Sequence, residues 1–244
     1  YLTQISSTLF FIIGFLDDLF SISSIKRLIL QSLVAIFIWV QGIQINKLDF
    51  SFISSNDNLY NLPVFLSLFI TVFWIVGVTN SFNWLDGLDG LSCGIAFISS
   101  LSFICLFLSY SNISELFLIF SLAGACLGFL FFNFYPAKLF MGDGGSYLLG
   151  SNLALFSIYS HTFFIESKIS HLSFLIPLLI LFIPLVDMSY VFFSRIYEGK
   201  LPFFPDRRHL HYRLMDMGVS HRRTVLIFYF FSILFSVLAF AFLP

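Results

Sequence analysis

Aspartates in three short polar segments are the groups of this sequence best suited to chemistry. The segments lie between apolar stretches and read GFLDDLF (14–20), NSFNWLDGLDG (80–90) and FMGDGGSYLLG (140–150). Asp17 and Asp18 are adjacent, and Asp86 and Asp89 stand three residues apart. Adjacent carboxylates beside an apolar helix repel each other and lose hydration unless they share a cation or a proton. The alternatives for Asp17 and Asp18 are therefore a plain solvated helix end, or Mg²⁺ binding or proton transfer.

The third segment combines Asp143 with glycines. Gly142, Gly144 and Gly145 let the backbone approach a ligand closely, and Ser146 can cap a helix that we expect to begin near Tyr147. Backbone N–H groups at a helix start suit a phosphate, and a carboxylate beside them suits the Mg²⁺ that accompanies a diphosphate. A simple glycine turn is the alternative. The segment is not a Walker A loop, because no Gly-Lys-Ser/Thr follows.

The basic groups gather in FPDRRHLHYRL (204–214). Its arginines and histidines could clamp an anion. A positively charged loop explains Arg208 and Arg213 equally well, but it does not explain His209 and His211 on either side of a leucine. Asp187 lies in an apolar run, and we interpret it as a hydrogen-bond partner for another helix slightly ahead of a site residue.

The composition indicates the kind of secondary structure that positions these polar groups. The 244 residues are 59% hydrophobic and only 10% charged, whereas soluble domains carry about 25% charged residues. This predicts an all-α, polytopic membrane bundle, because only helices and closed barrels span lipid and the apolar runs are too long for barrel strands. We expect one domain over 1–244, and the start at Tyr1 inside an apolar run predicts a fragment without its first helices. About eight spans are expected, at 1–16, 27–43, 62–79, 91–110, 114–134, 145–163, 171–194 and 223–243.

Because each span crosses the membrane, successive polar connections lie alternately on its two faces. One face receives ten of the twelve lysines and arginines and all five of the aspartates named from the three acidic segments, while the other receives only Lys47 and Lys168. Basic loops stay in the cytoplasm, so the acidic and histidine segments are predicted to be cytoplasmic, on a multi-pass protein of the inner (cytoplasmic) membrane. Carboxylates for Mg²⁺, a glycine-rich helix start and an Arg/His clamp together predict phosphoryl transfer from a water-soluble diphosphate to a lipid.

GFLDD, NSFNWLDGLDGL, FNFYPAKLFMGDGGS and PFFPDRRHLHYRL, in this order, resemble the polyprenyl-phosphate N-acetylhexosamine-1-phosphate transferases of glycosyltransferase family 4. The resemblance covers essentially the whole chain. It implies a Mg²⁺-dependent enzyme (Mn²⁺ is the other candidate) that transfers N-acetylhexosamine 1-phosphate from a UDP-N-acetylhexosamine to undecaprenyl phosphate. UMP is released, and the lipid-linked diphosphate sugar serves cell-envelope polysaccharide synthesis. The implied partners are these two substrates and membrane lipid, with no nucleic acid; a homodimer is compatible with the resemblance.

The resemblance also implies roles for individual residues. Asp17 and Asp18 would engage or deprotonate the lipid phosphate, and Asp86 matches a further acid of the family. Asp143 and Asn83 match the metal site, and Gly87, Leu88 and Asp89, with the stacking ring of Phe140, match the uracil pocket. Arg27 falls where a basic residue contacts phosphate. The basic cytoplasmic loop is matched by Arg207, as a substrate-binding residue, and by His209 and His211, as catalytic residues.

The branch within the family is indicated by Pro-Asp-Arg before His-x-His, which resembles the enzymes that use UDP-GlcNAc or a related donor. The alternative is the peptidoglycan branch, which takes UDP-MurNAc-pentapeptide. Two positions depart from the family: Ser21 replaces a third acid, and Tyr212 replaces a third histidine, so neither is assigned a role.

Three other interpretations remain. A transporter of an anionic lipid or nucleotide would usually place its polar groups near the midplane on repeated, broken helices. An Asp-rich prenyl-transferring enzyme would leave FMGDGGS and HLHYR unexplained. A third is an inactive family member that keeps the fold.

Overall fold

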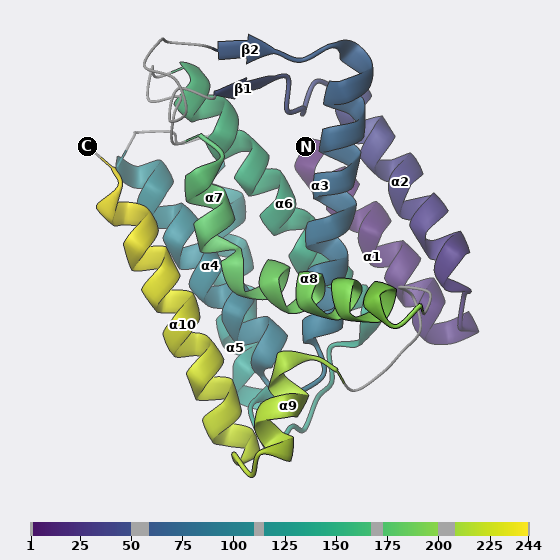
Figure 1. Ribbon diagram of the computed structural model, residues 1–244, viewed down its shortest axis with the longest axis vertical. Helices are drawn as coiled ribbons and strands as arrows, with labels where there is room; N and C mark the ends of the chain where they lie inside the picture. Colours follow the sequence, from purple (N-terminus) through teal and green to yellow (C-terminus); the bar gives the residue numbers. More distant parts are fainter. Residues whose placement is uncertain (1, 50–58, 110–114, 167–172, 200–207, 244) are drawn as a thin grey trace.

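The structure is a computed structural model that describes residues 2–49, 59–109, 115–166, 173–199 and 208–243. These residues form ten α-helices and one antiparallel pair of strands (Figure 1). The elements are α1 (Leu2–Phe20), α2 (Ser24–Val40), β1 (Lys47–Asp49), β2 (Leu59–Asn61), α3 (Val64–Leu85), α4 (Leu91–Ser109), α5 (Leu116–Asn133), α6 (Gly142–Glu166), α7 (Leu175–Ile180), α8 (Phe182–Tyr197), α9 (Leu210–Asp216) and α10 (His221–Ala241).

The predicted all-α membrane bundle is confirmed. In the described part of the chain, six helices are long and apolar enough to cross a membrane: α1, α3, α4, α5, α6 and α10. Their outer faces carry large apolar side chains; Phe65, Phe69 and Phe73 of α3, for example, are 66–73% exposed. Such a ridge suits a helix whose solvent is lipid. The second predicted span, 27–43, corresponds to α2, which has 17 residues.

The predicted run 171–194 is not one helix, which corrects the sequence prediction. It ends at Ile180 and restarts as α8, which crosses the lower part of the bundle in Figure 1. Pro184 explains the break, because proline has no N–H to donate to the carbonyl of Ile180 four residues earlier. That carbonyl instead accepts a hydrogen bond from the hydroxyl of Ser99 on α4, at 3.4 Å.

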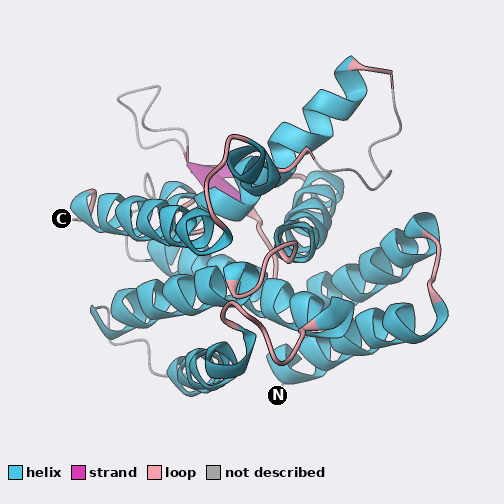
Figure 2. Cartoon of the chain, turned by 90° about the horizontal axis from the view of Figure 1, so that it is seen from below, coloured by secondary structure: helices cyan, strands magenta, loops and turns pink. Residues whose placement is uncertain are grey.

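The connections between helices gather at two ends of the bundle. The segments 21–23, 86–90 and 134–141 lie at the lower end in Figure 1 together with α9, whereas β1 and β2 lie at the upper end. Figure 2 looks onto the lower end and shows its loops drawn together between the helix ends. For the described residues, this division agrees with the two faces predicted from hydrophobicity.

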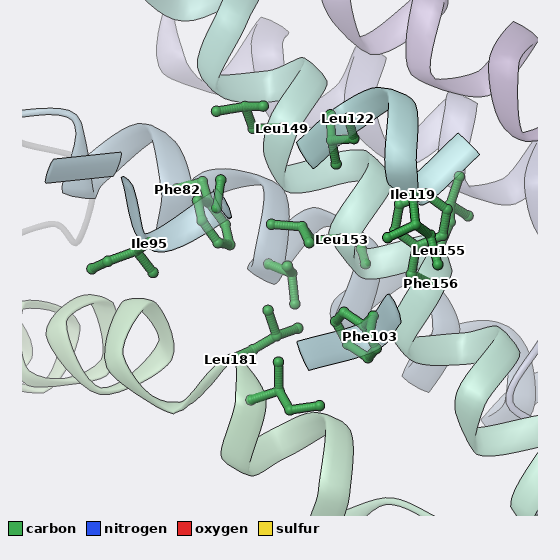
Figure 3. Packing of buried hydrophobic residues seen from close by; sticks show 14 of the residues in the cluster. Phe82, Ile95, Phe103, Ile119, Leu122, Leu149, Leu153, Leu155, Phe156 and Leu181 are labelled. Carbon is green, nitrogen blue, oxygen red and sulfur yellow. The ribbon is translucent and has the colours of Figure 1, made fainter. Parts of the chain in front are cut away.

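The buried core centres on α6, which packs against α1, α3 and α4. Large side chains fill the space between these helices, and Figure 3 shows Phe82, Phe103, Leu153 and Phe156 among them. Leu181, at the break between α7 and α8, is also fully buried and lies in the same cluster. The core therefore holds the lower ends of α3 and α6 in fixed positions, and these are the ends that carry the acidic segments.

Candidate active site

The lower ends of α1 and α6 are in close contact. Gly14 of α1 lies on the backbone of α6, where an added Cβ would collide with the carbonyl group of Asp143. Small residues at such crossings let membrane helices approach closely. Asp17 and Asp18, which follow on α1, are thereby brought to the start of α6.

Asp18 caps α6 from the neighbouring helix. Its two carboxylate oxygens accept hydrogen bonds from the backbone N–H groups of Asp143, at 2.9 Å, and of the next residue, at 3.1 Å. A carboxylate there satisfies free N–H groups and interacts favourably with the helix dipole. The prediction that Ser146 caps a helix beginning near Tyr147 is wrong: α6 begins at Gly142, because Asp18 supplies the acceptor from outside.

Arg27, near the start of α2, links two of the carboxylates. Its guanidinium pairs with Asp17 and, at 3.1 Å, with Asp143. The other oxygen of Asp143 accepts a hydrogen bond from the side-chain amide of Asn83, at 2.8 Å. Four helices thus contribute to one hydrogen-bonded group, which we call the acid cluster: Asp17, Asp18, Arg27, Asn83 and Asp143.

Asp86 adds a further carboxylate at the end of α3. Burial raises the pKa of Asp86 from 3.8 to about 8, and the charges of Asp143, Asp18 and Asp89 add to the shift. This residue therefore keeps its proton at neutral pH unless a cation lowers the local negative charge.

The acid cluster has the composition of a site for a hard divalent cation. Carboxylate and amide oxygens are the protein ligands that Mg²⁺ takes, together with phosphate oxygens and water. The cluster holds three carboxylates and one guanidinium, so negative charge is in excess. Asp143 and Asn83 are in direct contact and fit the predicted metal position.

The turn from Asp86 to Gly90 carries the predicted uracil pocket. Asp89 accepts a hydrogen bond from the backbone N–H of Ala137, at 2.9 Å, and so ties this turn to the segment before α6. Leu88, in the same turn, is buried in the core. The ring of Phe140 is 79% exposed and free to stack on a flat group.

Asn133, at the end of α5, was not among the predicted site residues. Its side-chain oxygen accepts a hydrogen bond from the N–H of Gly90 at 3.0 Å, and its amide donates to the carbonyl of Leu139 at 2.9 Å. It therefore holds the turn after α3 against the segment before α6. A buried asparagine at the end of an apolar helix, inside the quoted segment FNFYPAKLF, was the available signal.

The two predicted histidines lie together on the other side of the turn after α3. His209 Nδ1 is 2.7 Å from a carboxylate oxygen of Asp187, and the His209 and His211 rings stack at 5.2 Å. Asp187 is thus the interhelical hydrogen-bond partner that the sequence predicted. We call Asp187, His209 and His211 the histidine cluster. Its ligand atoms lie within 4.8 Å of one another, close enough for a metal ion as well.

His211 is fully buried without a hydrogen-bond partner among the described residues. Neither ring nitrogen is satisfied, and burial lowers the pKa of His211 to about 4, so the ring is neutral at physiological pH. A Cβ on Gly87 would lie 2.5 Å from His211 Nε2, so only glycine fits there. The hydroxyl of Tyr212 donates to the carbonyl of Gly87 at 3.3 Å, which connects α9 to the turn after α3.

An apolar groove of about 450 Å³ runs between α2, α3 and α8. Phe69, Phe73 and Phe192 are among its lining residues, and so are Arg27 of the acid cluster and Trp84. The ring of Trp84 contacts His209 edge-on, with centroids 5.9 Å apart. The groove therefore adjoins both clusters. Arg207, the remaining predicted site residue, lies outside the described residues.

Comparison with known proteins gives matches over most of the chain. The model of glycosyl transferase family 4 matches residues 2–161. A probable undecaprenyl-phosphate N-acetylglucosaminyl 1-phosphate transferase of Bacillus subtilis is 36% identical over 93% of this chain and 62% of its own length. An undecaprenyl-phosphate alpha-N-acetylglucosaminyl 1-phosphate transferase of Thermotoga maritima is 33% identical over 93% of this chain and 66% of its own. A phospho-N-acetylmuramoyl-pentapeptide-transferase of Prochlorococcus marinus is 34% identical, over 94% and 66%. The chain thus spans roughly two thirds of the length of these relatives.

Proposed function

The chain belongs to glycosyl transferase family 4, and from this premise we propose that it transfers N-acetylhexosamine 1-phosphate from a UDP-sugar, UDP-GlcNAc or a close relative, to undecaprenyl phosphate. The observation that carries the proposal is the position of Arg27. This one side chain pairs with two carboxylates of the acid cluster and also lines the apolar groove. A lipid phosphate needs a cationic side chain at this position, because its apolar chain would lie in the groove while its phosphate meets the reacting groups.

The bond changes of the proposed reaction are simple. An oxygen of the lipid phosphate forms a bond to the sugar-bearing phosphorus of the UDP-sugar. The bond from that phosphorus to the bridging oxygen breaks, and UMP leaves with its electrons. Little covalent chemistry is asked of the protein, so positioning and charge neutralisation supply most of the catalysis.

The acid cluster supplies this positioning. Arg27 would bind the lipid phosphate, and Asp17, the carboxylate paired with it, would engage that phosphate or accept its proton. Asp143 and Asn83 would hold Mg²⁺, which neutralises diphosphate charge when bound. Asp18 keeps the start of α6 in place through its two backbone hydrogen bonds.

The nucleotide would bind on the turn after α3. Asp89 and the backbone of Leu88 are proposed to contact uracil, with the exposed ring of Phe140 stacked on it. The two histidines, across Gly87, would then face the sugar diphosphate.

We further propose that this end of the bundle faces the cytoplasm from the inner membrane, because it carries the excess of lysine and arginine. Ser21→Cys and Tyr60→Cys, which are exposed at opposite ends, provide the test. In intact cells an impermeant thiol reagent should label position 60 and should reach position 21 only after permeabilisation. The reverse pattern would overturn the orientation.

The function is tested with the full-length protein in membranes. The assay supplies undecaprenyl phosphate and Mg²⁺, and measures UMP release with UDP-GlcNAc, UDP-GalNAc and UDP-MurNAc-pentapeptide in parallel. We expect UMP and a lipid-linked product with an N-acetylhexosamine donor. Activity with UDP-MurNAc-pentapeptide alone would move the protein to the peptidoglycan branch, and no UMP with any donor would refute the proposal.

A further inference from the structure

Both carboxylate oxygens of Asp187 contact residues at the start of α9. One oxygen is 2.7 Å from His209 Nδ1, and the other accepts a hydrogen bond from the backbone N–H of Leu210, at 2.8 Å. The side chain is 1% exposed, so no water competes for these contacts. A buried carboxylate needs such partners, and here both come from the first residues of one short helix.

These contacts restrict the His209 ring. With a carboxylate as its acceptor, Nδ1 must carry a proton, because a carboxylate cannot donate one to it. The oxygen bound to Leu210 N–H prevents Asp187 from turning away. Nδ1 therefore faces the protein, and only the ring edge with Nε2 is left to meet a ligand. The His209 side chain keeps 9% of its surface exposed.

The surroundings of His209 connect this edge to the site. The ring lies between Trp84, which lines the groove next to Arg27, and His211, which borders Gly87. A half-turn of the imidazole would put a ring carbon in the place of each nitrogen and turn Nε2 away from this space. Trp84 meets the ring edge-on, and His211 stacks on its face and makes no hydrogen bond to a described residue, so the orientation depends on Asp187.

We propose that Asp187 is a positioning residue for the transferase: it fixes the Nδ1–H tautomer and the ring orientation of His209, so that Nε2 meets the sugar diphosphate. The inference rests on the proposed function, since it takes His209 as a residue that contacts substrate. A metal ion on the histidine cluster is a less suitable occupant, because both oxygens of Asp187 are already engaged.

Asp187→Asn separates positioning from simple stabilisation of α9. Asparagine has one side-chain acceptor. If that oxygen keeps the Leu210 N–H bond, the amide nitrogen faces His209 and donates to Nδ1, which moves the ring proton to Nε2. The opposite arrangement leaves two donors facing each other at Leu210. We therefore expect the variant to keep α9 and to reverse the tautomer, with kcat reduced roughly 10- to 100-fold, by analogy with the partners that orient metal-ligating histidines.

The decisive measurement is ¹⁵N NMR of histidine-labelled full-length protein in detergent with EDTA, so that a bound metal cannot fix the tautomer. His209→Gln assigns the signal. We expect Nδ1–H in the wild type and Nε2–H in Asp187→Asn. The same tautomer in both proteins would overturn the proposal, whatever the enzymatic activity.

Kinetics add a second test. The kcat loss of Asp187→Asn should disappear when His209 is already alanine, and Asp187→Glu, which retains both acceptors, should recover part of it. An equal loss in both backgrounds would mean that Asp187 only stabilises the fold. If the wild type releases no UMP from any donor, the proposed function fails, while the NMR result still decides the tautomer.

Discussion

The acid cluster and the histidine cluster are built in opposite ways. The acid cluster joins side chains of four helices, two of which, α1 and α6, are long and pack along their length, and Arg27 pairs with two of its carboxylates. The histidine cluster depends on α9, a helix of seven residues that is held by Asp187 and by the bond from Tyr212 to Gly87. His211 keeps two buried nitrogens without partners.

The contrast indicates a division of labour. A preorganised group of charges is suited to neutralising phosphates, since its geometry does not change when the ligand arrives. A short helix with unsatisfied polar atoms is suited to closing on a ligand that supplies the missing hydrogen bonds. We therefore expect changes in the acid cluster to reduce turnover most, and changes around the turn after α3 to act mainly on binding.

The largest effect should come from Asp143→Asn. The variant keeps the shape of the side chain but removes the charge that pairs with Arg27 and fits the cation. UMP release should fall by about 10²–10³-fold, the range seen when one electrostatic contact to reacting phosphates or oxyanions is lost. Ser146→Ala is the matched comparison: it removes no charge, only the hydroxyl that accepts a hydrogen bond from Asn83 at 3.0 Å, so it should lose much less activity. Full activity with unchanged Mg²⁺ dependence in Asp143→Asn would remove this residue from the metal site.

Asp17→Asn and Asp89→Ala separate chemistry from binding. Asp17 pairs with Arg27, so its loss should lower kcat and leave UMP affinity nearly intact. Asp89 links the turn after α3 to the backbone N–H of Ala137. Its loss should raise the nucleotide KM about tenfold, the effect of roughly one hydrogen bond to a charged group. UMP titration alongside turnover measures both. Loss of UMP binding in Asp17→Asn with normal binding in Asp89→Ala would reverse the two roles.

Gly14→Ala tests whether the acid cluster depends on the contact between α1 and α6. The added methyl group would meet the backbone of α6, and such overpacking costs about 1–3 kcal/mol. The melting temperature should fall together with activity. In Gly128→Ala the new Cβ has nothing within 4 Å, so it should leave both unchanged. Equal behaviour of the two variants would show that close packing at Gly14 is unimportant.

The last prediction concerns the pH dependence of stability rather than turnover. Folded Asp86 has a pKa of about 8, whereas an unfolded aspartate has its ordinary value of 3.8. Between these values the folded state binds more protons, so the contribution of Asp86 to stability is fully present below about pH 4 and is lost as pH rises towards 8. Melting temperatures in EDTA should decline over this range in the wild type and decline less in Asp86→Asn. Parallel curves would show that Asp86 is not the group responsible.

The sequence predicted most of the helices and the gathering of the acidic segments at one end of the bundle. Runs of apolar residues define membrane helices because lipid leaves the backbone no alternative, and acidic residues at their ends then fall at the same face. The break at Pro184 was missed, because membrane helices often tolerate proline and only the donor from Ser99 made the break inexpensive. That donor lies on another helix, beyond the reach of local patterns.

The same limit explains the errors in detail at the site. Ser146 was expected to cap α6 because it is nearby in sequence, whereas Asp18 does so from 125 residues away. In the sequence, Asn133 is only a polar residue at the end of an apolar helix. Its hydrogen bonds to two separate loops become visible only in the folded structure. Asp187 was recognised as an interhelical partner, but the identity of His209 as that partner required the fold.

The bonds from Asp18 to the first N–H groups of α6 also have a mechanical consequence. Together with Gly14, they prevent α1 and α6 from sliding past each other along the bilayer normal. A bilayer that becomes thinner or thicker must then be matched by tilting the two helices as one body. The spacing between Asp17 and Asp143 would stay constant through such changes, so the geometry of the acid cluster would not depend on the thickness of the membrane.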